Sequence, residues 1–449
     1  MARPRKNADK AQNSLLTPDN VVEIPVEEQP YPLPEGWRWV RLESVLSASK
    51  EKTEDFSSPS LRYIGLEHFE KDNGITGFAS AEGVRSLKNI FHPGQILYGK
   101  LRPYLNKHDI ADFDGVCSTD ILVFNCLSRA NNKFINYFFN LSYFQEYAVA
   151  NSKGINLPRV SEKVILDAVF PLPHLDEQQR IVERIESLFA KLDEAKAKAE
   201  AVLDGFEIRK AAILHKAFTG ELTAKWREIR GIKKENNTVK IKDILSDIKY
   251  GTSEKSDYTY TGLPVIRIPN ITGSSVDLED LKFLKSSKSS DYDLVERNDI
   301  LMIRSNGSRE LVGKCALVDE AIVGKAYASF LIRLRPNPTI NPKYLLGFLN
   351  SSLARNQLFA KAKSSAGIHN INSKEICSVD IWLPDKKEQQ EIVRILDNLL
   401  AKERHIREAA ENALSQIDLM KKAILARAFR GELGTHSSAR DTLQNNGSM

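Results

Sequence analysis

The sequence contains few of the residues from which metal sites are usually built. Its 449 residues include four cysteines and 8 histidines, and neither a CxxC pair nor a cluster of histidines occurs. Zinc sites that can be recognised from sequence need such closely spaced Cys and His ligands. We therefore predict no metal site, and a reducing cytoplasm is the simplest location for a chain with Cys117, Cys126, Cys315 and Cys377.

Long hydrophobic runs are also missing. No stretch approaches the roughly 20 apolar residues of a membrane-spanning helix, and the N-terminal "MARPRKNADKAQNSLL" lacks the apolar core of a signal peptide. The hydrophobic fraction of 42% and the charged fraction of 27% are ordinary for a soluble globular protein. We interpret residues 1–32 as a polar N-terminal arm and expect no membrane partner.

Catalytic motifs are absent as well. No stretch has the spacing of a Walker A loop, and the Asn-Pro pairs of "PNPTINPK" lack the proline and aromatic residue of an amino-methyltransferase motif. The segment "LPDKKEQQ" has the wrong spacing for a nuclease signature, and the capped start of a helix is the better interpretation. We therefore predict that this chain has no catalytic residue and binds no cofactor.

Charges of the two signs are nearly balanced. The chain has 64 Lys and Arg residues against 59 Asp and Glu residues, so its formal net charge is +5. This excess suits contact with nucleic acid but does not establish it. Any DNA-binding surface must therefore be a local patch rather than a field that covers a whole domain.

The sequence does contain an internal repeat. The phrase "EQQRIVERIESLFAKL" begins at Glu177 and its relative "EQQEIVRILDNLLAKE" at Glu388, while "KAAILHKAFTGEL" from Lys210 is matched by "KKAILARAFRGEL" from Lys421. Both pairs have the same offset of 211 residues, 177 to 388 and 210 to 421. A constant offset over two separate phrases indicates that a whole structural unit is duplicated.

Each repeat carries the pattern of a long helix. Apolar or small residues recur in alternating steps of four and three, as in the seam of a coiled coil, and only Glu403 interrupts them. We place the first helix with its linker at 174–236, the second helix at 385–433 and a polar tail at 434–449. The two stripes are Ile181, Ile185, Leu188, Leu192, Ala195, Ala199, Val202, Phe206 and Ile213, and then Ile392, Leu396, Leu399, Ile406, Ala410, Ala413, Ile417, Met420 and Ile424.

Local signals mark the ends of both helices. Asp176 and Asp385 are predicted to cap the two N-termini, and Gly220 and Gly431 suit the left-handed position just past a helix end. At 1.5 Å per residue, roughly 40 residues of uninterrupted helix would form a rod of about 60 Å.

The segments that precede the helices, residues 33–173 and 237–384, are predicted to be β-rich. Short runs such as "RYIGL", "QILYGKL" and "DILVF" alternate with turn residues, and the second segment repeats the order with "PVIRI", "DILMIRS" and "SFLIRLRP". The fold class is therefore α+β, with two globular β-rich domains and two long helices. The loops differ most between the copies, so we expect them to carry recognition.

With these features the chain resembles the specificity subunits of type I restriction–modification enzymes. The resemblance runs from Leu33 to Leu433 and rests on "LPEGWRWVRL", "PLPHLDEQQRIVERI", "AFTGELTAKWRE", "WLPDKKEQQEIVRIL" and "ILARAFRGEL". It implies two target-recognition domains separated by an antiparallel pair of long coiled-coil helices, with pseudo-twofold symmetry. The activity it implies is non-catalytic recognition of DNA. The N-terminal arm has no counterpart in the resemblance.

Partners and cofactors are implied by the same resemblance. We expect double-stranded DNA with two short half-sites around an unspecified spacer, two methyltransferase (modification) subunits, and motor-nuclease (restriction) subunits. S-adenosylmethionine, ATP and magnesium are expected on those subunits rather than on this chain. The competing hypothesis is a coiled-coil scaffold whose globular ends bind proteins instead of DNA.

Two loops are the candidate DNA-binding elements, because each follows a predicted strand and combines cations with amides. Arginine can pair with guanine and asparagine with adenine, whereas lysine and serine more often hold phosphate. The first loop contributes Lys100, Arg102, Tyr104, Asn106 and Lys107, the second contributes Arg304, Asn306, Ser308, Arg309 and Lys314, and "PVIRIPNI" adds Arg267 and Asn270.

One apolar set around the end of the first helix has two interpretations. Phe218, Leu222 and Trp226 flank Gly220 in "AFTGELTAKWRE". They either dock a methyltransferase subunit or pack beneath the adjoining domain, and the sequence favours neither.

Overall fold

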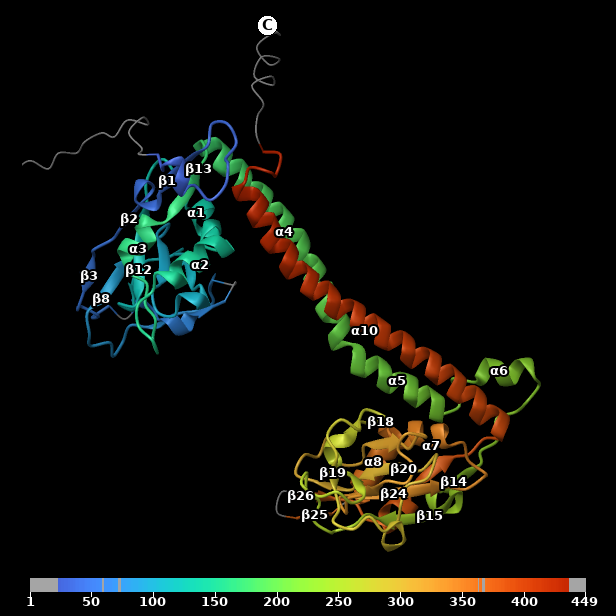
Figure 1. Cartoon of the computed structure of the whole chain (residues 1–449). Coiled ribbons are helices and arrows are strands. Elements are labelled where there is room, and N and C mark those ends of the chain that lie inside the picture. The colour runs from blue at the N-terminus through green and yellow to red at the C-terminus, as the bar shows by residue number, and fades with distance from the viewer. Residues whose placement is uncertain (1–22, 59, 72–73, 362, 366–367, 436–449) are drawn as a thin grey trace, which may run out of the picture. The chain divides into compact units, whose positions relative to one another are not determined.

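The computed structural model describes residues 23–58, 60–71, 74–361, 363–365 and 368–435. They divide into two compact units, the first made of residues up to 198 together with those from 413 onward, the second of residues 199–412 (Figure 1). None of the helices in the described part combines the length and the apolar character that a membrane crossing requires. Each unit contains one globular domain and parts of the long helices.

The first globular domain is built on two sheets. An antiparallel sheet has the order β10-β9-β12-β2, and a second sheet has the order β3-β8-β11-β4-β7, in which β11 and β4 run parallel. The strands of the first sheet are β10 (His108–Ile110), β9 (Ile96–Gly99), β12 (Ile121–Cys126) and β2 (Leu46–Ala48). Those of the second are β3 (Lys52–Thr53), β8 (Lys88–Phe91), β11 (Gly115–Cys117), β4 (Arg62–Ile64) and β7 (Ala79–Ser80).

Three short helices close the core of this domain, namely α1 (Asn132–Phe138), α2 (Ser142–Ala150) and α3 (Glu162–Asp167). Their buried aromatic side chains pack against the strand β13 (Val169–Leu172) and against the end of the second long helix. The rings of Phe134 and Phe429 stack with their centroids 4.5 Å apart. The domain and the helices of its unit therefore share one hydrophobic core.

The second globular domain repeats this arrangement. Its main sheet has the order β15-β24-β20-β22, and β16 pairs in parallel with β23 as β4 does with β11. The strands are β15 (Leu245–Tyr250), β24 (Leu331–Pro336), β20 (Ile300–Ile303), β22 (Cys315–Leu317), β16 (Pro264–Ile266) and β23 (Ala326–Tyr327). Helices α7 (Pro342–Leu349), α8 (Ser352–Lys361) and α9 (Ser373–Cys377) follow in the same order as α1 to α3. This topology confirms that the duplication includes the globular parts.

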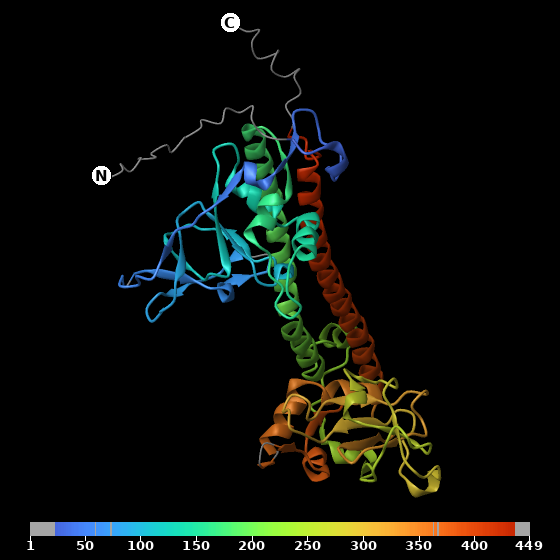
Figure 2. The ribbon, with the colours of Figure 1, turned by 60° about the vertical axis from the view of Figure 1, so that its left-hand side comes forward.

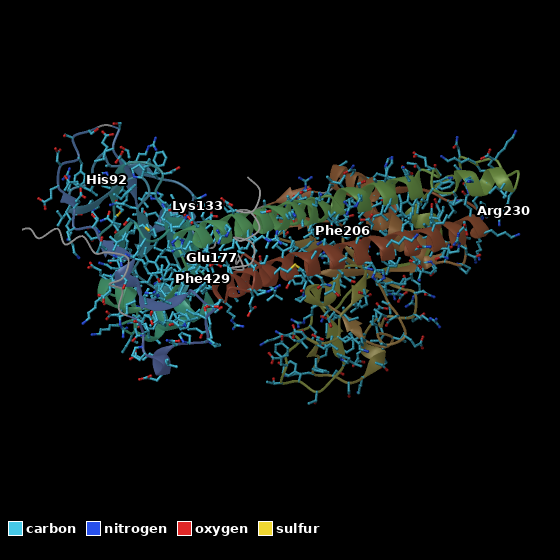
Figure 3. The ribbon with its side chains drawn as sticks, turned by 90° about the horizontal axis from the view of Figure 1, so that it is seen from above. His92, Lys133, Glu177, Phe206, Arg230 and Phe429 are labelled. Carbon is cyan, nitrogen blue, oxygen red and sulfur yellow. The ribbon has the colours of Figure 1, made fainter. Side chains whose placement is uncertain are left out.

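The long helices are α4 (Leu175–Asp204), α5 (Phe206–Phe218) and α10 (Lys386–Phe429). In the first unit α4 runs beside the C-terminal part of α10, and Lys421 Nζ of α10 donates to Asp193 Oδ1 of α4 at 2.6 Å (Figure 2). In Figure 3, Glu177 on α4 and Phe429 on α10 lie close together at the first domain. The predicted closing glycines are confirmed, because Gly220 and Gly431 have φ of +79° and +72°.

The first long helix is not continuous, contrary to the prediction of an uninterrupted rod. The helix breaks at Gly205. Glycine is unfavourable inside a helix, and only proline is more so. The guanidinium of Arg209 donates to the carbonyl of Val202 at 3.0 Å and to Glu403 Oε2 at 2.9 Å. Glu403, which interrupts the apolar stripe in the sequence, is therefore the partner of an arginine at the helix break.

The caps and the stripe agree with the sequence only in part. Asp385 caps α10, since its Oδ1 accepts from the N–H of Glu388 at 2.8 Å. The cap at Asp176 is wrong: α4 begins one residue earlier, so Asp176 lies inside its first turn. Along the predicted seam Ile185 and Ile417 are buried, but Ile406 is 46% exposed. Ala195 and Ala413 are exposed as well, so a continuous coiled-coil seam stays a prediction.

Candidate nucleic-acid interface

Each globular domain is joined to its long helix by one buried glutamine. The N–H of Asn131, the cap of α1, donates to Gln178 Oε1 at 2.8 Å, and Gln178 Nε2 donates to the carbonyl of Pro173 at 2.9 Å. The N–H of Asn341, the cap of α7, donates in the same way to Gln389 Oε1 at 2.7 Å. These bonds explain the repeated "EQQ". In both units its first glutamine, on the long helix, accepts the backbone N–H of the residue that caps a helix of the globular domain.

The glutamate before each glutamine is buried too, but its partners differ. In the first unit Trp37 Nε1 donates to Glu177 Oε2 at 3.1 Å. In the second, Thr223 Oγ1 donates to Glu388 Oε1 at 2.6 Å, and Arg227 forms a buried ion pair with the same carboxylate. Arg227 was missed from the sequence, because its partner lies far away along the chain. The only signal was that an acidic residue recurs at both positions.

The loop after β9 presents part of the predicted DNA-binding set. Arg102 and Tyr104 are exposed, and Lys100 Nζ lies 3.7 Å from Asp120 Oδ1. Arg102 has a φ of +53°, in the left-handed region that non-glycine residues seldom adopt. Such backbone strain is concentrated at functional sites. A DNA-binding role of these three residues stays a prediction.

The other two members of the first set have structural contacts. Asn106 is 4% exposed, and its amide donates to Asn140 Oδ1 at 3.1 Å and contacts His108 Nε2 at 3.0 Å. Lys107 Nζ donates to the carbonyl of Leu66 at 2.6 Å. A base contact by Asn106 would require the loop to open, so we assign these side chains to shaping the loop.

In the second domain the loop after β20 becomes a short strand, β21 (Ser305–Asn306). Arg304 precedes it, donates to the carbonyl of Ser329 at 3.2 Å and to Asn370 Oδ1 at 3.0 Å, and lies 4.8 Å from the ring of Tyr250. The Asn306 Oδ1 accepts from the N–H of Ser308 at 2.7 Å. Both side chains are half-buried at a surface loop, within reach of a ligand.

The remaining candidates of the second loop differ in exposure. Ser308 and Arg309 are exposed, and the Arg309 guanidinium lies 5.0 Å from the ring of Phe359. Lys314 is half-buried, and its carbonyl accepts from the N–H of Ile303 at 2.9 Å. Ser308 and Arg309 are therefore the more accessible candidates.

Arg267 and Asn270 hold a neighbouring turn. Asn270 is 1% exposed and donates to the carbonyls of Asp277 and Asp280, at 3.0 and 2.9 Å. Arg267 donates to Asp280 Oδ2 at 2.9 Å. This pair is better explained as a support for residues 277–280 than as a reading element.

The apolar set at the end of the first helix packs mainly within its own unit. Phe218 is buried, with its ring 5.2 Å from that of Tyr344, and Leu222 lies against the same core. Trp226 is half-buried beneath Arg230, whose guanidinium is 4.5 Å from the ring. The packing interpretation therefore holds for Phe218 and Leu222, and Trp226 stays a candidate for partner contact.

Each candidate loop is hydrogen-bonded to a hairpin of its own domain, and neither hairpin is among the residues predicted from the sequence to bind DNA. The N–H of Val160 donates to the carbonyl of Lys100 at 2.9 Å, and the N–H of Ile371 donates to that of Arg304 at 2.8 Å. These bonds are equivalent, because 160 and 371 differ by the repeat offset. Strand end and hairpin thus form one surface element in each domain. The paired echo "SKGINLP" and "SAGIHNIN" was its sequence signal.

His92 of the first domain lies outside the candidate loops and contacts two surface carboxylates. His92 Nδ1 lies 2.6 Å from Asp114 Oδ1, and Nε2 lies 3.3 Å from Glu51 Oε2. The bonds to these two carboxylates raise the pKa of His92 above its ordinary value of 6.5. Among the residues that the structure describes, no group of His, Cys, Asp and Glu could hold a metal ion.

The model of one protein family, described as the type I restriction modification DNA specificity domain, matches residues 34–203 and 233–416. The chain belongs to this family of DNA specificity domains. Each matched segment contains one globular domain and most of the helix, α4 or α10, that follows it. The two halves of the repeat are therefore two copies of one specificity domain.

Curated relatives and solved structures agree with this membership. The type I restriction enzyme EcoKI specificity subunit of Escherichia coli K12 is 32% identical over 323 residues, 72% of this chain and 68% of that protein. The EcoBI specificity subunit of Escherichia coli is 30% identical over 303 residues, 63% of this chain and 62% of that protein.

Among solved structures, the HsdS subunit from Thermoanaerobacter tengcongensis has a TM-score of 0.64 at 22% identity, covering 90% of this chain and 99% of that one. A chain from structural work on complex assembly and conformational transition of the type I R-M system reaches 0.72 at 22% identity, covering 90% and 100%. At this identity the likeness concerns the fold alone.

Proposed function

We propose that this chain is the DNA sequence-recognition and assembly subunit of a type I restriction–modification complex. The observation that carries the proposal is the repetition of one sheet order around two chemically different strand-end loops. In the first domain Lys100, Arg102 and Tyr104 stand at that position, and in the second Arg304 and Asn306 do. A shared scaffold with unlike loops suits the recognition of two different short DNA sequences.

Assembly is the second part of the proposal. The resemblance implies an antiparallel coiled-coil pair that holds the two domains apart, with two methyltransferase subunits and motor-nuclease subunits docked on the chain. The chain itself would be non-catalytic and cytoplasmic, with S-adenosylmethionine, ATP and magnesium bound by its partners. Membership of a DNA specificity family disfavours the alternative of a protein-binding scaffold.

The proposal is tested by selection from a random-sequence duplex library with the full chain and its methyltransferase subunits. We expect enrichment of two short conserved sequences separated by a gap of fixed length and free sequence. Enrichment of a single continuous site would contradict two independent domains. Failure to enrich any sequence would contradict DNA recognition itself.

A further inference from the structure

A hairpin in the first domain presents an apolar tip that the protein interior does not use. The N–H of Lys153 donates to the carbonyl of Arg159 at 2.9 Å, and the N–H of Arg159 donates back to that of Lys153 at 2.8 Å. Between them Ile155 is 100% exposed, and Leu157 is exposed as well. An apolar side chain stabilises a fold when it is buried away from water, so the fully exposed Ile155 does not stabilise this domain.

The hairpin is fixed by its backbone. The N–H of Arg102 donates to the carbonyl of Pro158 at 2.7 Å, so the tip is joined to the candidate DNA-binding loop. Gly154 has a φ of +106°, and a Cβ there would lie 3.0 Å from the carbonyl oxygen of Leu157. Only glycine suits this position. The hydrogen bond to Arg102 and the tight turn at Gly154 thus hold Ile155 at the exposed tip of the hairpin.

The surroundings of the tip are cationic. Segments 99–107 and 152–160 contain no Asp or Glu, and their cations are Lys100, Arg102, Lys107, Lys153 and Arg159. Arg102, Lys153 and Arg159 are exposed. Asp120, from an adjacent turn, lies 3.7 Å from Lys100 and 3.4 Å from Arg159 and neutralises part of this charge. An apolar tip flanked by cations complements duplex DNA, because the cations can contact the phosphates along a groove while the apolar tip reaches the stacked bases.

We propose that Ile155 is a wedge that inserts against the base stack of the first half-site and opens one base step. Apolar side chains, isoleucine among them, unstack base steps in proteins that bend DNA. Burial of Ile155 and Leu157 and contacts of the flanking cations with phosphate would offset the cost of unstacking. The proposal rests on the proposed function, since it requires the first domain to bind DNA.

The second domain contains the corresponding hairpin, formed by β25 (Lys363–Ser365) and β26 (Ile368–Asn370). Its tip lies outside the described residues. The proposal therefore concerns only the hairpin of the first domain.

The test uses the full chain with its methyltransferase subunits, and as probe the duplex that the wild-type complex enriches from the random library. The fluorescent adenine analogue 2-aminopurine, placed in turn at each position of the first half-site, reports unstacking. The variants are Ile155→Ala, Ile155→Leu as the conservative replacement, and Val26→Ala as a matched control at another exposed aliphatic residue of the first unit.

For Ile155→Ala we expect about a tenfold loss of affinity, or ~1.4 kcal/mol, with the fluorescence increase at one base step abolished. The salt dependence of binding should not change, because no phosphate contact is removed. Ile155→Leu should restore both signals, and Val26→Ala should behave as wild type. Since Ile155 is fully exposed, the melting temperature should stay the same.

The proposal is overturned if Ile155→Ala binds the enriched duplex and reports the base step as wild type does. It is also overturned if the variant loses only its association with the methyltransferase subunits, which would make the tip a protein contact. A wild-type complex that enriches no duplex would instead refute the proposed function, so the two failures are distinguishable.

Discussion

The buried glutamine of the second unit offers a direct test of how a domain is fixed to its helix. Gln389 is buried, whereas its neighbour Gln390 on α10 is exposed. Replacing Gln389 by alanine removes the acceptor of the Asn341 N–H at 2.7 Å. It also removes the donor to the carbonyls of Pro384 at 2.8 Å and Thr339 at 3.3 Å. Three backbone groups at the junction of domain and helix then lose a partner.

The expected loss of stability follows from those three groups. A buried polar group left without a partner costs about 1–3 kcal/mol. The bond to Thr339 is long, and a water that enters the space of the lost side chain would satisfy some of the groups. We therefore expect Gln389→Ala to lower the free energy of unfolding of the second unit by roughly 2–5 kcal/mol. Gln390→Ala should change it by less than about 0.5 kcal/mol.

Hydrogen exchange measured by mass spectrometry is the suitable assay, because a chain of two units need not unfold in one step. Exchange should accelerate in α7, whose cap is Asn341, and stay unchanged in α1 of the first unit. Gln178→Ala should give the reverse pattern, since Gln178 serves the cap of α1. If Gln389→Ala exchanged in α7 no faster than Gln390→Ala, the glutamine would not be what holds the domain to the helix.

Three further outcomes are expected. Arg227→Ala should destabilise the second unit by about 3–5 kcal/mol, because Glu388 is left as a buried unpaired charge. Hydrogen exchange in the second unit measures the loss, with Arg230→Ala at an exposed arginine as the control, and equal losses would contradict the buried pair. Arg304→Ala should weaken binding to the enriched duplex by roughly 1–3 kcal/mol, whereas equal weakening on random duplex would reassign the residue to phosphate. His92→Gln should flatten the dependence of the melting temperature of the first unit on pH. Because the pKa of His92 is raised in the folded protein, protonated His92 stabilises the fold below pH 6.5, and this stabilisation is lost as the pH rises through the raised pKa. Identical melting profiles for the variant and the wild type would contradict a stabilising role of protonated His92.

Features set by local chemistry could be predicted from the sequence. The duplication, the order of the strand runs, the closing glycines at Gly220 and Gly431 and the cap at Asp385 are all confirmed by the structure. Each depends on residues that are neighbours along the chain or on direct comparison of the two copies. The break at Gly205 was missed because the apolar stripe continues through it in the sequence.

Features that depend on distant residues could not be predicted. Arg227 and Glu388 are 161 positions apart, and nothing near either one identifies its partner. Burial separates Asn106 from the exposed Arg102 in the same loop, although their residue types suggest the same role. The fully exposed Ile155 lies in the phrase "SKGINLP", and nothing in its neighbouring residues indicates that this isoleucine stays outside the core. Contact between these loops and DNA stays a prediction.

The central claim is that two domains of common architecture recognise two separate DNA sequences. The most direct measurement is a map of base methylation in a genome that carries the complex, made before and after residues 237–384 are exchanged for the matching segment of a relative. The account predicts that one half of the methylated sequence changes while the other half and the spacer length stay the same. A change in both halves, or methylation at the original sequence, would contradict it.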